Sequence, residues 1–284
     1  MWSSIKGDGR LNTFWNDIRP IVARVYHEQF TTGLLVLLTV VTLMFAQWHF
    51  RARLTPQWQR RICWSLLGML VLSGLAHAWR FAWLGDDAFI SFRYSQNFAE
   101  GHGLVFNLGE WVEGYTNFLW TFLLGVLHFV GLSIPHTALF LDLAAFAGVV
   151  VIAHKIVSHL LGTTMLYPSW TSILLAASTP FVIYATSGLE TMPAVFCVVL
   201  GIYASIKMRY RRAGLYFVLG AMMRPDHILF WGCMGLAFAL DDVWTRSGSL
   251  FRRLDWRRYF SFSLALFCLY VPFFAFRWWL YGDM

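Results

Sequence analysis

Long apolar runs follow one another along almost the whole chain, and they constrain its fold more than any other feature. Runs long enough to cross a membrane lie near residues 31–50, 62–84, 116–134, 137–160, 168–186, 190–206, 213–241 and 259–280. A helix of about 20 residues crosses the hydrocarbon core of a bilayer, where only helices and closed barrels satisfy their backbone hydrogen bonds. The runs therefore predict an all-α integral membrane protein with about eight helices.

The composition and the charge pattern fit a membrane setting. Hydrophobic residues make up 58% of the 284 residues and charged residues only 13%, which leaves too little polar surface to cover a soluble globule. The formal net charge of +7 arises largely from short basic runs between the apolar ones, at 51–61, 207–212 and 252–258. Because short basic loops mark the cytoplasmic side, we expect a multi-pass protein of the cytoplasmic membrane and no nucleic-acid partner.

The pattern divides the chain into four parts. Residues 1–30 mix polar, charged and aromatic side chains without a cleavable signal peptide, which predicts an interfacial segment. Residues 31–84 hold the first two membrane helices, 85–115 form an extracytoplasmic loop, and 116–284 hold the remaining membrane helices. A cytoplasmic basic run before residue 62 directs the second helix outward, so the loop faces the outside.

Prolines and charges interrupt two of the apolar runs. Three spans between Glu113 and Ser187 would place these residues on opposite faces, so one of the intervening runs is expected to be short or broken. Pro168 and Pro180 make 168–186 the favoured choice, since proline removes a helical hydrogen-bond donor.

The other interruption lies in the run 213–241. Two charges and a proline at Arg224–Pro225–Asp226 predict two half-length helices with a polar tip. The alternative is a single span in which Arg224 and Asp226 neutralise each other.

Two adjacent carboxylates, Asp86 and Asp87, lie where the second apolar run ends. Aspartate is costly in hydrocarbon, so the pair is expected to face water, a cation or a polar substrate. On spacing alone the pair has three uses: a general base, a holder of a divalent cation against a phosphate, or a cap for the next helix. Aromatic residues at helical spacing over 88–98 predict that this next helix is short and interfacial.

Histidines and cysteines give no further metal site. The four cysteines lie singly in apolar runs without CxxC spacing, and His102 has no second histidine at ligand spacing. We therefore predict no metal ligand set, and a divalent cation at the paired aspartates is the one cofactor left open.

Several stretches resemble, in order, the GT-C membrane glycosyltransferases. The nearest resemblance is to the bacterial branch that includes the terminal β-1,2-arabinofuranosyltransferases and relatives that glycosylate pilin. It covers residues 85–283 and leaves out 1–60. The stretches that carry it are Asp86–Tyr94, Gly101–Glu110, Val112–Trp120, Ser187–Thr191, Arg224–Asp226 and Arg277–Asp283.

The resemblance implies a GT-C-like helical bundle that transfers a sugar, arabinofuranose in the nearest branch, from a polyprenyl-phosphate donor. The acceptor is a hydroxyl of a glycan, glycolipid or protein at the outer face of the cytoplasmic membrane. Asp86 matches the family's catalytic base, and Asp87 is its neighbour in the catalytic pair. The side chains expected to bind substrate are Arg93, Glu113, Glu190, Arg224 and Asp226, with Arg224 compensating phosphate charge.

Two other functions remain open. A transporter or flippase for lipid-linked sugars fits the broken helices and the intramembrane charge, although no internal repeat is visible. An inactive membrane subunit is the third reading, because the resemblance leads us to expect a chain truncated relative to the family.

Overall fold

The computed structural model describes residues 54–162, 167–245 and 254–282, together with six separate positions between 34 and 49. Within these residues the chain folds into helices, turns and loops, without a strand. The expected interfacial segment 1–30 lies outside the described residues, as does most of the run 31–50. The helices in chain order are α2 (Pro56–Arg80), α3 (Ala88–Ala99), α4 (Phe118–Phe129), α5 (Ile134–Leu160), α6 (Trp170–Ala177), α7 (Thr179–Tyr184), α8 (Thr191–Ile206), α9 (Tyr210–Met223), α10 (Ile228–Thr245), α12 (Trp256–Ala265) and α13 (Val271–Tyr281).

The predicted all-α membrane protein is confirmed. Four described segments are long and apolar enough to cross a membrane, namely Pro56–Arg80, Ile134–Leu160, Pro225–Thr245 and Trp256–Tyr281. In the last of these, a π-helical turn at Leu266–Tyr270 joins α12 to α13. Helices α4 and α8 are apolar but shorter.

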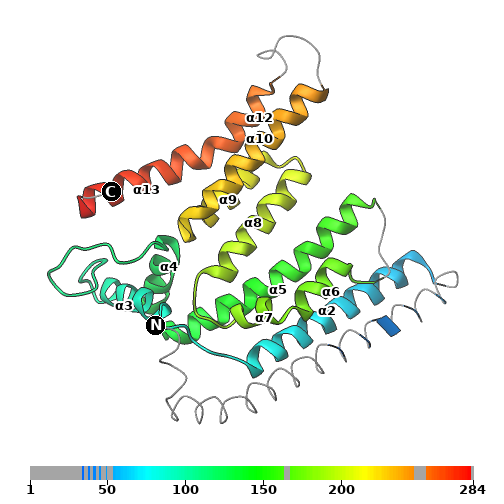
Figure 1. Ribbon diagram of the computed structural model, residues 1–284, viewed down its shortest axis with the longest axis horizontal. Coiled ribbons are helices and arrows are strands. Elements are labelled where there is room, and N and C mark those ends of the chain that lie inside the picture. Colours follow the sequence, from blue (N-terminus) through cyan, green and yellow to red (C-terminus); the bar gives the residue numbers. More distant parts are fainter. Residues whose placement is uncertain are drawn as a thin grey trace, which may run out of the picture.

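Helices α2, α5, α8 and α9 lie side by side, with α3 and α4 at one end of the group (Figure 1). We call this the acidic end, because Asp86, Glu190 and the turn at Arg224 lie there. The opposite end, where α2 begins and α5 and α8 finish, is the basic end. At the acidic end the amide of Gly85 donates to the carbonyl of Ser187 at 2.9 Å. The segments before α3 and before α8 are therefore joined directly.

The run 116–134 forms a shorter helix than its apolar length predicts. It yields only the 12-residue α4, which packs beside α3, as the 2.8 Å hydrogen bond from Ser95 Oγ to the carbonyl of Thr121 shows. The run 168–186 is broken as expected, into α6 and α7, yet it still leads from the basic end back to the acidic end. Pro168 lies just before α6 and Pro180 in the first turn of α7, where proline does little harm, so the expected interruption falls between two short helices and not within one.

The predicted break at Arg224 is confirmed, with one correction. Helix α9 ends at Met223 and Arg224 has extended backbone angles, φ −139° and ψ 115°. A 3₁₀ turn at Pro225–His227 then leads into α10. The second arm was expected to be too short to span alone, but it continues past Asp241 and Asp242 to give 21 residues, Pro225–Thr245, long enough to cross.

Glycines let neighbouring helices approach closely. A Cβ on Gly214 of α9 would overlap the backbone carbonyl of Phe262 in α12, and a carbonyl, unlike a side chain, cannot rotate away. Gly232 of α10 instead faces open space. The contact of α9 with α12 therefore depends on the missing side chain at Gly214.

We expect Gly214→Ala to lower the free energy of unfolding by about 2 kcal/mol or more, since inserting a methyl group into a packed contact typically costs 1–3 kcal/mol. Gly232→Ala is the matched control, and its effect should be neutral or stabilising because alanine favours helix. Thermal unfolding of both variants in lipid nanodiscs measures the difference. Equal midpoints for the two variants would contradict the close approach.

Candidate functional site at the acidic end

Glu190 is the centre of a buried polar network at the acidic end. Its side chain is only 11% exposed. One carboxylate oxygen accepts from Asn117 Nδ2 at 2.7 Å, and the other accepts from Arg224 Nη1 at 3.3 Å. Arg224 Nε also lies 3.4 Å from Asp226 Oδ1. A carboxylate thus joins the start of α8 to the start of α4 and to the turn after α9.

Ser91 of α3 extends this network. The Nδ2 group of Asn117 lies 2.8 Å from Ser91 Oγ, and Asn117 Oδ1 accepts from Thr121 Oγ1 at 3.0 Å. All of these side chains except Arg224 and Asp226 are buried. Because a buried amide has its donors and acceptors satisfied only in one orientation, the network fixes Glu190 firmly.

Several helices begin at this end. Asn117 and Glu190 occupy the position before α4 and α8, but neither side chain caps its own helix; they bond to each other instead. Helix α3 starts nearby after Asp87, and α10 starts after the turn at Arg224. Helix starts carry partial positive charge and unpaired amides, so the acidic end is suited to an anion such as a phosphate.

Asp86 and Asp87 are exposed on the turn that leads into α3. Asp87 occupies the N-cap position, yet its side chain makes no capping hydrogen bond. Neither carboxylate has a hydrogen-bond or ion-pair partner among the residues that the structure describes. The hydrogen bond between Gly85 and Ser187 holds the pair at the same end as Glu190. The capping alternative thus lacks its hydrogen bond, and both carboxylates are accessible to substrate.

Arg93 and Glu113 lie outside the network around Glu190. Arg93 Nε donates to the carbonyl of Phe106 at 3.3 Å, and Glu113 accepts from Arg277 Nε of α13 at 2.5 and 2.7 Å. These two residues hold the loop between α3 and α4, whereas the network around Glu190 includes Arg224 and Asp226. The structure therefore divides the expected substrate-binding residues into two groups.

Aromatic side chains fix the same loop. The phenol of Tyr94 donates to the carbonyl of Val112 at 2.7 Å and accepts from the amide of Gly114 at 2.9 Å. The phenol oxygens of Tyr115 and Tyr281 are 3.2 Å apart, which links the loop to α13. Burial raises the pKa of Tyr94 and, more strongly, that of Tyr115, so both phenols keep their protons at neutral pH.

We expect Glu113→Gln to loosen the loop from α13. A hydrogen bond between charged groups contributes about 1.5–3 kcal/mol, and partial exposure of this pair places it at the lower end of that range. Hydrogen exchange should become about tenfold faster in the loop peptides and stay unchanged in α5. Glu110→Gln, which alters an exposed carboxylate of the same loop, is the control. Unchanged exchange in the Glu113 variant would contradict the attachment.

Asn117, Asp142 and Arg277 were not assigned roles from the sequence. Asp142 is completely buried in α5 and accepts from the amide of Gly188 at 2.9 Å, so it shapes the turn before Glu190. Its signal was a lone carboxylate inside the run 137–160, where charges are rare. Asn117 precedes an apolar run, a typical capping position, whereas the pairing of Arg277 with Glu113 had no local signal.

No group of three or more His, Cys, Asp or Glu side chains gathers closely enough to hold a metal ion within the part of the chain that the structure describes. Asp86 and Asp87 are adjacent and exposed, so a divalent cation in solution can reach both carboxylates.

Comparison with known proteins gives two curated relatives that carry the same name. The chain is 36% identical over 141 residues to a terminal β-(1→2)-arabinofuranosyltransferase of Mycobacterium tuberculosis, covering 45% of this chain and 21% of the relative. It is 32% identical over 119 residues to the protein of the same name in Corynebacterium glutamicum, covering 39% of this chain and 17% of the relative. No family model matches the chain, and no solved structure matches it. The chain spans about a fifth of the length of these relatives, and its similarity to them supports a relationship to glycosyltransferases.

Proposed function

We propose that this protein is a GT-C-type glycosyltransferase of the cytoplasmic membrane, with its site at the acidic end on the outer face. The two relatives named arabinofuranosyltransferases support sugar transfer, with arabinofuranose as the first sugar to test. The observation that carries the proposal is the joining of the exposed Asp86–Asp87 pair to the turn before Glu190, through Gly85 and Ser187. An accessible carboxylate and a guanidinium held by a buried carboxylate thus occur at one end of a membrane bundle.

In the proposed reaction Asp86 acts as general base. Its carboxylate takes the proton of the acceptor hydroxyl while that oxygen attacks the anomeric carbon of the sugar. The bond from the anomeric carbon to the phosphate oxygen breaks on the opposite side, and the electron pair leaves with the polyprenyl phosphate. The configuration at the anomeric carbon is therefore inverted.

Arg224 is suited to the departing phosphate. Its side chain is 38% exposed, and its Nη1 and Nε groups are held by Glu190 and Asp226. Its Nη2 group has no described protein partner and is available to a phosphate oxygen, which guanidinium groups bind strongly. The helix starts around it add partial positive charge. In the proposed reaction the donor phosphate therefore lies beside Arg224.

Transfer of labelled sugar tests the proposal. Purified protein in proteoliposomes is given a polyprenyl phosphate that carries labelled arabinofuranose, together with an arabinan oligosaccharide acceptor. We expect label in the acceptor and free polyprenyl phosphate as the second product. A flippase, favoured by the broken segment at Arg224, would move the labelled lipid between leaflets without breaking it. Intact donor after prolonged incubation would contradict the transferase.

A further inference from the structure

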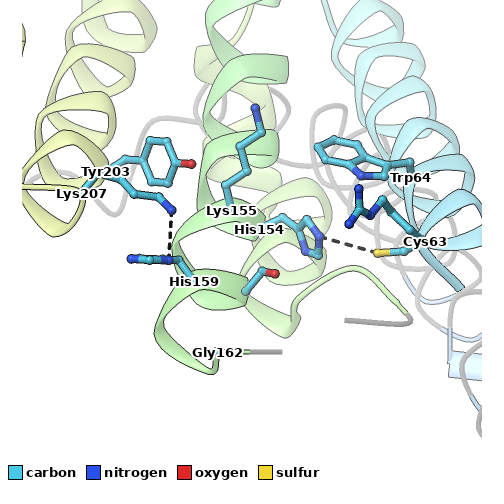
Figure 2. Close-up of a pocket in the computed structure, with 10 residues that line it drawn as sticks. Cys63, Trp64, His154, Lys155, His159, Gly162, Tyr203 and Lys207 are labelled. Carbon is cyan, nitrogen blue, oxygen red and sulfur yellow. Dashed lines mark hydrogen bonds between the residues drawn. The ribbon is translucent and has the colours of Figure 1, made fainter. Parts of the chain in front are cut away.

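A second polar site lies at the basic end, opposite the proposed catalytic site. A cavity of about 510 Å³ opens there between the beginning of α2 and the final turns of α5 and α8. Figure 2 shows the labelled side chains of α5, including Lys155 and His159, between Tyr203 and Lys207 of α8 and Trp64 of α2. The cavity is thus built from three helices that are far apart in the sequence.

The charge of this cavity is not balanced. Three cations, Arg60, Lys155 and Lys207, line it, and no carboxylate is among the described residues that do so. None of the three forms an ion pair with a carboxylate in the described ranges. Arg60 and Lys207 are exposed and Lys155 is half-buried, whereas a buried cation of the same bundle is neutralised. That cation, Arg258, pairs with Asp241 and Asp242 at 3.2 and 2.8 Å.

Two histidines, His154 and His159, also line the cavity. His154 Nδ1 accepts from the amide of Ser169 at 3.2 Å, and its Nε2 lies 3.6 Å from Cys63 Sγ. His159 Nδ1 lies 3.1 Å from the ammonium of Lys207 and accepts from it. An acceptor Nδ1 requires a proton on Nε2 of a neutral ring. His159 therefore presents an N–H group beside the cations.

Helix dipoles stabilise the charge of only some of these cations. Lys207 lies just after the end of α8, where positive charge is favourable, whereas Lys155 lies more than one turn before the end of α5. Arg60 lies just after the first turn of α2, and its side chain has no hydrogen-bond or ion-pair partner within the described residues. Arg60 is therefore available to an anion in the cavity.

We propose that this cavity binds the phosphate group of an anionic membrane lipid. Helices α2 and α5 are both long and apolar enough to cross a membrane, so their ends at the cavity lie near the level of lipid headgroups. Trp64 and Tyr203 line the cavity, and these two residue types are enriched at membrane interfaces. Basic pockets between membrane helices bind phosphate headgroups on the cytoplasmic side, the side that the basic runs predict for this end.

Lipid binding by matched charge variants tests the proposal. Lys155→Gln/Lys207→Gln removes two charges from the cavity, and Arg61→Gln/Arg212→Gln removes two charges at positions that do not line it. The affinity of the purified full chain for phosphatidylglycerol is measured by native mass spectrometry, with phosphatidylcholine and inorganic phosphate as further probes. Because each basic residue near an anionic surface contributes substantially to binding, we expect the cavity variant to bind phosphatidylglycerol at least about tenfold more weakly. The control should bind within about twofold of the unaltered protein.

Arg60→Gln gives an independent variant, because the exposed Arg60 side chain supports no described contact and its loss leaves the fold intact. It should weaken phosphatidylglycerol binding severalfold while thermal unfolding without lipid stays unchanged. Equal losses in the cavity and control variants would overturn the proposal in favour of diffuse surface charge. Equal affinity for phosphatidylcholine, or binding of inorganic phosphate without binding of the lipid, would also overturn it.

Discussion

Asp86→Asn is expected to reduce sugar transfer by at least about 100-fold, since general-base catalysis contributes on the order of 10²–10⁴-fold in rate. Asparagine has nearly the same shape as aspartate but cannot accept the proton of the acceptor hydroxyl. The Asp86 side chain is exposed and makes no described hydrogen bond or ion pair, so the variant should fold normally. Initial rates with saturating labelled donor, together with thermal unfolding, measure both effects.

Asp87→Asn is the matched control for this experiment. It removes the same charge from the adjacent residue, so a general loss of negative charge would affect both variants equally. We expect a smaller loss, about tenfold or less, because Asp87 does not take the proton of the acceptor hydroxyl in the proposed reaction. Transfer by the Asp86 variant at close to the normal rate would remove Asp86 from the mechanism, and a larger loss in the Asp87 variant would assign the base to Asp87.

Glu190→Gln is expected to reduce transfer by on the order of 100-fold and to destabilise the fold by about 1–3 kcal/mol, the usual cost of leaving a partly buried polar partner unsatisfied. Glutamine keeps the shape and an oxygen for Asn117, but Arg224 loses its buried carboxylate and its position. Asp226→Asn is the control. Asp226 is 61% exposed, so its ion pair with Arg224 contributes little to stability.

Urea unfolding and transfer rates of the two variants separate structure from chemistry. The Glu190 variant should lose both stability and turnover, whereas the Asp226 variant should keep its stability within about 1 kcal/mol. If Glu190→Gln is as stable and as active as the unaltered protein, the network around Glu190 does not organise the site.

The apolar runs and the prolines predicted most of the helical architecture. Proline constrains local backbone and charge is costly in hydrocarbon, so the break at Arg224–Pro225 was visible from adjacent residues alone. The run 116–134 was expected to be long enough to span because its residues are apolar. Its helix ends early, at Phe129, and it packs against α3 through contacts that hydropathy does not reveal.

The site was only partly predictable, because contacts between residues far apart in the sequence depend on the fold. Glu190 and Arg224 were identified as separate stretches, and their ion pair required the fold. Arg277 and Glu113 are 164 positions apart, so no local pattern indicates that they pair. Arg93 was a reasonable phosphate ligand by residue type, but in the structure it donates to the carbonyl of Phe106 in the adjoining loop.

Photocrosslinking locates the donor site most directly. A polyprenyl phosphate that carries a photoreactive group beside the phosphate is irradiated with the intact protein in nanodiscs, and the labelled peptides are sequenced. A donor site at the acidic end predicts label in the segments around Gly85–Ser91, Ser187–Glu190 and Arg224–His227. It also predicts that unlabelled polyprenyl-phosphate sugar reduces this labelling by competition. Label confined to the basic end, at Arg60, Lys155 or Lys207, would contradict a catalytic site at the acidic end.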